Sequence, residues 1–114
     1  MLRTLHKIAS YLIVALGCAH LLFTFHNYDS FDMDAVWFFG AGMAIVFAGF
    51  LNIVVLRADV GDRLALLLCL LADLFLLVGF AGALTVMRQP QVLTGALLSA
   101  VATVGVLRLL FRRA

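Results

Sequence analysis

The chain has 114 residues, of which 66% are hydrophobic and only 12% are charged. Soluble domains are about half apolar and about a quarter charged, and small domains bury the smallest fraction of their surface. This composition excludes a water-soluble fold, so lipid is the expected solvent for the outer surface. The formal net charge of +2 is small, and the basic residues lie at the ends of apolar runs rather than in a patch, so we expect no nucleic-acid partner.

Four apolar segments are long enough to cross a bilayer, which takes about 20 residues in a helix. They predict helices over residues 6–27, 34–56, 62–87 and 91–111, within a single domain that spans 1–114. Because the connections are short, neighbouring helices are expected to pack as antiparallel hairpins. The predicted fold is an all-α membrane protein, an antiparallel four-helix transmembrane bundle.

Residues that favour helix ends stand in each connection. Asp32 is placed to cap the N-terminus of the second helix. Asp59 is placed to cap the third helix, with Asp62 in its first turn, where the helix dipole favours an anion. Pro90 suits the first turn of the fourth helix, because its missing N–H has no partner to lose there.

The basic residues predict the orientation, since loops on the cytoplasmic side of a membrane carry an excess of lysine and arginine. Seven of the eight lie on one side of the predicted spans, namely Arg3, Lys7, Arg57, Arg63, Arg108, Arg112 and Arg113. Only Arg88 lies on the other side. We therefore expect a multi-pass protein of the bacterial inner membrane with both termini in the cytoplasm.

Small and polar residues recur at helical spacing in every segment. Because polar side chains within a bilayer turn toward protein, these stripes predict the buried faces and the helix–helix contacts. The stripes are His6, Ser10, Gly17, His20, Thr24 and Asn27 in the first helix, Ala35, Gly42, Gly49 and Asn52 in the second, Asp62, Cys69 and Asp73 in the third, and Gly95, Ser99 and Thr103 in the fourth.

Asp73 stands out because it is an acid near the middle of a span. Insertion of such a residue costs about 2.5–3.5 kcal/mol, and an unpaired ion costs more. No lysine or arginine within a span is placed to pair with it. One interpretation is a neutral Asp73 that hydrogen-bonds to Asn52, Ser10 or Tyr11 and holds the helices in register. The other is a site that binds a proton or a small ligand.

The predicted site residues are polar residues of the expected interior, and they are Asp73, His20, Asn52, Ser10, Tyr11 and Thr24. By helix rise, Asn52, Ser10, Tyr11 and His20 lie about one to two turns from Asp73. His20 lies toward the outer side, and as a group that titrates near neutrality it would suit a proton relay. A haem between two histidines is disfavoured, because neither His6 nor His26 lies opposite His20 at equal depth. We expect no cofactor.

A weak metal-binding spacing occurs at the outer rim, where His26 and Asp29 are three residues apart and can share a helix face. Interface anchoring and helix capping explain the rim residues without a metal. No catalytic motif is present, so an enzyme is the least favoured class.

The segment from His20 to Asn52 carries a resemblance to a known group of proteins. It reads His20-x3-Thr24-x3-Tyr28, then Phe31, then Ala35-Val36-Trp37-Phe38-Phe39-Gly40-Ala41-Gly42, and ends in Gly49-Phe50-Leu51-Asn52. This pattern resembles short four-span bacterial membrane proteins that have no assigned activity. The resemblance implies the four-span fold and a shared feature at His20, Trp37 and Asn52, but it implies no chemistry.

We therefore expect a protein that binds or translocates a proton or small ligand in the bundle interior around Asp73. The alternative is a structural or accessory subunit that acts through helix–helix contacts, and an intramembrane enzyme is a more distant one. Besides the lipid bilayer, the expected partner is a second copy of the chain or another membrane protein. Gly40, Ala44 and Ala48, four residues apart on the second helix, form one candidate face for that contact.

Overall fold

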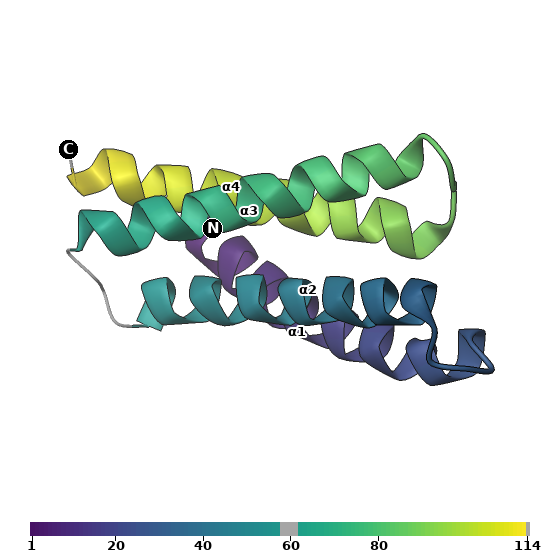
Figure 1. The fold of residues 1–114 in the computed structure, drawn as a ribbon. Helices are drawn as coiled ribbons and strands as arrows, with labels where there is room; N and C mark the ends of the chain where they lie inside the picture. The colour runs from purple at the N-terminus through teal and green to yellow at the C-terminus, as the bar shows by residue number, and fades with distance from the viewer. Residues whose placement is uncertain (58–61, 114) are drawn as a thin grey trace.

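The computed structural model describes residues 1–57 and 62–113, and within those ranges it is helical apart from short connections. The helices are α1 (Leu2–Asn27), α2 (Met33–Arg57), α3 (Arg63–Leu84) and α4 (Pro90–Arg113). Each of them is long and apolar enough to cross a membrane. The prediction of an all-helical membrane protein with four candidate spans is thus confirmed (Figure 1).

The helix N-termini follow the capping chemistry of the sequence. A carboxylate oxygen of Asp32 accepts a hydrogen bond of 3.0 Å from the backbone N–H of Ala35, so Asp32 caps α2 as predicted. Asp62 was predicted in the first turn of α3, but it is the N-cap: α3 begins at Arg63, and Asp62 accepts from the N–H of Leu64 at 3.0 Å. The predicted cap Asp59 lies outside the described residues. α4 begins at Pro90, as predicted.

The third helix is shorter than the sequence pattern suggested, because α3 ends at Leu84 and not at residue 87. The chain leaves the helix in a turn in which the N–H groups of Val86 and Met87 both donate to the carbonyl oxygen of Ala83. Apolar periodicity continues through this turn, so composition alone did not reveal the end of the helix.

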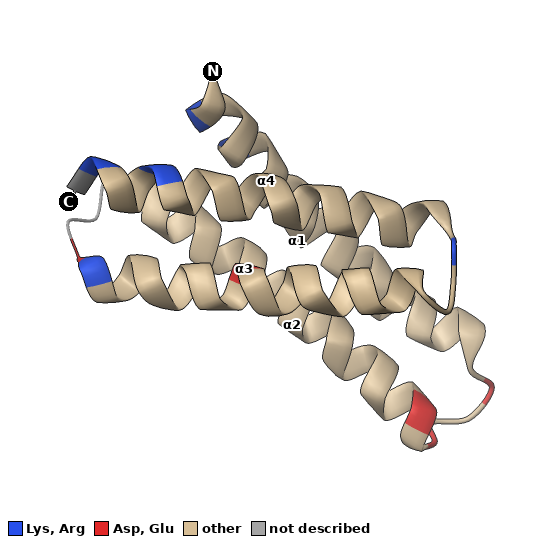
Figure 2. Ribbon diagram, turned by 90° about the horizontal axis from the view of Figure 1, so that it is seen from above, with Lys and Arg blue, Asp and Glu red and all other residues tan. Residues whose placement is uncertain are grey.

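The helices pack as two pairs, α1 with α2 and α3 with α4, and the pairs cross at an angle (Figures 1 and 2). Glycines let α1 and α2 approach closely. A Cβ atom on Gly49 would lie 2.6 Å from Cγ2 of Val14 and 3.0 Å from its backbone nitrogen. A Cβ atom on Gly17 would lie 2.8 Å from the backbone nitrogen of Val46. Small residues at a helix crossing are the usual means of close packing in a bilayer.

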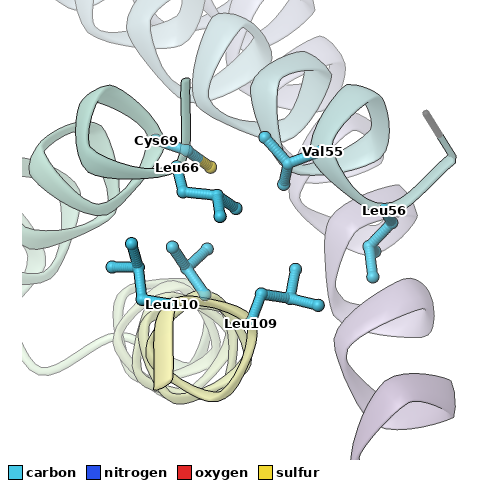
Figure 3. Close-up of a cluster of buried hydrophobic side chains, with 7 residues drawn as sticks. Val55, Leu56, Leu66, Cys69, Leu109 and Leu110 are labelled. Atoms are coloured by element: carbon cyan, nitrogen blue, oxygen red, sulfur yellow. The ribbon is translucent and has the colours of Figure 1, made fainter. Parts of the chain in front are cut away.

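Two apolar clusters hold the pairs together. The larger one lies near the C-terminal end of α4 and consists of Val55, Leu56, Leu66, Cys69, Val106, Leu109 and Leu110 (Figure 3). The smaller one joins Ile13, Ile45 and Ala102 near mid-bundle. Between these clusters the interior is polar, and Asn52 lies there. The stripes of α2 and α4 are buried as predicted, whereas Asn27 of the first stripe and Asp62 of the third are exposed, contrary to the prediction.

Candidate functional site

Asp73 is completely enclosed in the interior, with no solvent-exposed surface. One of its carboxyl oxygens, Oδ1, lies 2.6 Å from Nδ2 of Asn52 on α2. The other, Oδ2, lies 3.9 Å from the Sγ atom of Cys69, one turn earlier on α3. One amide and one thiol therefore face the two oxygens of the acid.

Asn52 links this acid to a histidine. Its Nδ2 atom lies 2.8 Å from the carbonyl oxygen of Ala48, and its Oδ1 atom lies 2.8 Å from Nε2 of His6 on α1. A backbone carbonyl can only accept a hydrogen bond, so the Ala48 contact orients the amide with its nitrogen toward Ala48 and Asp73. The Oδ1 atom then accepts, which places the hydrogen of the imidazole on Nε2 of His6.

The fourth helix, α4, contacts the network through a glycine, Gly105. A Cβ atom on Gly105 would overlap with the ring of His6, so the ring packs directly on the α4 backbone. Its Nδ1 atom is buried and has no hydrogen-bond partner among the described residues. His6, Asn52, Cys69 and Asp73 thus form one continuous polar cluster, the Asp73 network, to which all four helices contribute a surface.

Two arginines lie near the His6 end of the network. Arg3 and Arg108 are the charged groups that act on the His6 ring through space. Arg3 is held in place by a hydrogen bond of 3.2 Å from Nη2 to the carbonyl oxygen of Leu56. Asp73 itself is faced by the neutral side chains of Asn52 and Cys69.

Ser10 and Tyr11 were proposed from the sequence as neighbours of Asp73, and neither hydrogen-bonds to it in the described part of the chain. The hydroxyl of Ser10 donates to the carbonyl oxygen of His6 at 2.7 Å, within its own helix. Tyr11 is 48% exposed and lines a cavity of about 70 Å³ together with Arg3 and Lys7. Of the three proposed hydrogen-bond partners, Asn52 is the one that contacts Asp73.

His20 and Thr24 belong to a different place in the molecule. The imidazole of His20 stacks on the ring of Phe38, with centroids 3.8 Å apart and an interplanar angle of 14°. Thr24 is buried, and its hydroxyl donates to the carbonyl oxygen of His20 at 3.4 Å. Of the six predicted site residues, Asp73 and Asn52 thus meet in the Asp73 network, and Ser10 bonds to the backbone of His6 beside it. Tyr11 lines a separate small cavity, and His20 and Thr24 lie in a third region.

Sequence reasoning placed His6 on the buried stripe but left it out of the site. A signal for it was present, because His6 lies four residues after the start of α1 and Asn52 lies five residues before the end of α2. Helices that run in opposite directions bring such positions to a similar depth. Cys69 also lay on the stripe of Asp73, one turn away.

The pair His26 and Asp29, the weak candidate for a metal site, has no further ligand group beside it among the described residues. Both His26 and Asp29 are exposed, and the His26 ring contacts Phe23 edge to face. Among the residues that the structure describes, no group of three or more histidine, cysteine, aspartate or glutamate side chains could hold a metal.

Fold and site together define the class, a multi-pass membrane protein with a polar network enclosed between its helices. Comparison of the chain with protein-family models, with curated proteins and with solved structures finds no match in any of the three. The function is therefore inferred from the geometry.

Proposed function

We propose that this chain is an inner-membrane protein of bacteria that binds and releases a proton at Asp73. It forms an antiparallel bundle with both termini in the cytoplasm, as the seven-to-one division of basic residues favours. The observation that carries the proposal is the bridging amide of Asn52, which joins the buried acid Asp73 to the buried base His6.

The contacts of Asp73 suit both protonation states of its carboxyl group. Oδ1 accepts from the Asn52 amide in either state, because that oxygen needs no proton. A proton on the acid therefore resides on Oδ2, opposite the sulfur of Cys69. A thiol is both a weak donor and a weak acceptor, so it can face Oδ2 with or without that proton.

His6 has a fixed role in this arrangement, because its Nε2–H donates to Asn52 and its Nδ1 faces the backbone of α4 at Gly105. An amide does not pass a proton along as a hydroxyl or water does. We therefore assign Asp73 as the group that exchanges the proton and His6 as the group that orients Asn52 toward it.

The experiment is an infrared difference titration of the carboxyl band in nanodiscs, with Asp73→Asn as the reference. Asparagine at this position still accepts from Asn52 but carries no exchangeable acid proton, so it is a matched control for the fold. We expect a reversible carboxyl band between about pH 5 and 8 that the variant lacks. A band that never changes would refute proton exchange.

The second candidate is an accessory subunit whose network only holds the helices in register. The enclosure of Asp73 favours it, since no exposed surface of this residue reaches a cavity. A carboxyl group that stays protonated at every pH, together with an Asp73→Asn variant that retains full stability, would establish this candidate. Transport of a proton across the membrane would further need a second copy or a partner, because a bundle this small leaves no room for a pore.

A further inference from the structure

A large cavity lies far from the Asp73 network, at the end of the bundle where the α1–α2 and α3–α4 connections are found (Figure 1). Its volume is about 560 Å³, within the range of small-molecule sites. Polar side chains line it at several points, namely His20 and Asn27 of α1, Gln89 of the connection and Gln91 of α4. The surrounding wall is apolar and aromatic.

His20 is the chemically distinctive group of this cavity. Its Nε2 atom is buried and has no hydrogen-bond partner within the described residues. A buried polar atom without a partner is destabilising. Because this atom has no accessible surface, it meets a bound molecule only when the ring turns toward the cavity, and the hydrogen bond made there removes that cost. The stacked rings of His20 and Phe38 also give the cavity a flat wall, which suits a flat ring.

An apolar groove of about 460 Å³ leads away from this cavity between α2 and α3. Ala44 and Ala48 line it from α2, and Ala72 and Gly79 line it from α3. Ala41 lines both the groove and the cavity, so the two spaces adjoin. A cavity with polar groups at several points thus continues into an apolar groove between α2 and α3.

We propose that the cavity and the groove together bind a lipid-soluble molecule with a flat, uncharged, hydrogen-bonding head and a hydrocarbon tail, the chemistry of the prenylated quinones. The head lies against His20 and the tail lies in the groove. The head region is separate from the Asp73 network, whereas the groove borders the network at Ala48, whose carbonyl oxygen accepts from Asn52. The proposal does not depend on proton exchange at Asp73.

The charges at this end of the bundle favour an uncharged head over a phosphate. Asp29, Asp32 and Asp34 lie in and beside the α1–α2 connection, and Arg88 is in the α3–α4 connection (Figure 2). Three carboxylates against one guanidinium give a formal sum of −2. Such a surface repels the anionic head of a phospholipid.

The position of the head against His20 is tested by titrating the purified protein in nanodiscs with decylubiquinone. We expect His20→Leu to weaken binding about tenfold, the loss of one buried hydrogen bond. His26→Leu removes the same ring from an exposed position of the same helix and is the matched control, with unchanged affinity expected. Equal affinity in the two variants would overturn the assignment of His20.

The position of the hydrocarbon tail is tested by a substitution that places a larger side chain in the groove. Gly79 and Gly82 both lie on α3 with no other side chain or distant backbone within 4 Å of an added Cβ atom, so a side chain can begin at either position without overlap. Gly79 lines the groove, whereas Gly82 lines neither space. We expect Gly79→Leu to weaken decylubiquinone and to leave the tailless ubiquinone-0 unaffected, and we expect Gly82→Leu to change neither.

Two further outcomes would overturn the proposal. Displacement of decylubiquinone by phosphatidylglycerol but not by phosphatidylcholine would identify an anionic lipid head as the occupant. A change from dimer to monomer in Gly79→Leu with unchanged quinone affinity would identify the groove as the contact with a second copy of the chain.

Discussion

The amide nitrogen of Asn52 lies 2.6 Å from a carboxyl oxygen of Asp73, and this contact joins α2 to α3 in the interior. The two helices belong to different pairs and pack on each other less extensively than either packs on its own partner. An apolar groove opens between them on the lipid side. The hydrogen bond between these two residues is therefore a directional tie between the two halves of the bundle.

The tie predicts opposite results for two substitutions of the acid. In Asp73→Ala, the amide hydrogen of Asn52 loses its acceptor in a closed interior, which destabilises the protein by about 1–3 kcal/mol. In Asp73→Asn, a carbonyl oxygen replaces the lost acceptor, and stability stays within about 0.5 kcal/mol of the wild type. Reversible unfolding in mixed micelles measures both, and equal losses would show that the acceptor is immaterial.

The bridging role of Asn52 predicts strong coupling with Asp73. Asn52→Leu leaves both the His6 donor and the Asp73 acceptor without partners, whereas the second change Asp73→Leu then removes a group that is already isolated. We expect the double variant to be more stable than the sum of the single losses by about 0.5–2 kcal/mol. Additive losses in this double-mutant cycle would contradict a direct contact.

Gly105 predicts a steric test of the His6 contact. A methyl group at this position overlaps with the His6 ring, so Gly105→Ala is expected to destabilise the protein by about 1–3 kcal/mol through overpacking. The control is Gly82→Ala, which places the same methyl in open space. That change is expected to stabilise α3 by about 0.5–1 kcal/mol, since glycine is a poor helix former.

The proposed orientation predicts which engineered thiols face the cytoplasm. In a background with Cys18→Ala and Cys69→Ala, a cysteine at Gln89 is expected to react with a membrane-impermeant maleimide added to intact cells. A cysteine at Thr4 is expected to react only after the cells are broken, because Thr4 lies near the N-terminus. The reverse labelling pattern would invert the topology.

Much of the fold was predictable because its determinants are local. A span depends on the length and hydropathy of one segment, and a cap depends on one side chain beside one helix start, so Asp32 and Pro90 could be assigned from the sequence. The end of α3 was placed three residues too late, because Thr85, Val86 and Met87 remain compatible with a span by composition.

The candidate site was predictable only in part. Asp73 was identifiable because an acid in an apolar span is costly, and Asn52 because its stripe faces inward. The predicted shell also contained Tyr11 and His20, which point elsewhere in the structure, to a cavity beside basic residues and to the cavity at the opposite end. Depth along a helix misplaced His20, which lines the cavity at the other end, and rotation about the crossing helices was not available from spacing.

The sequence by itself determined that this protein has four apolar spans, which faces of α2 and α4 are buried, and that one acid lies among them, because periodicity and composition are properties of single helices. Only the tertiary structure decided that His6, and not Ser10 or Tyr11, completes the network of Asp73 through Asn52. The physical reason is that a hydrogen bond needs its atoms within about 3 Å of each other. That distance is set by how the pairs cross and by the space that Gly105 leaves for a ring.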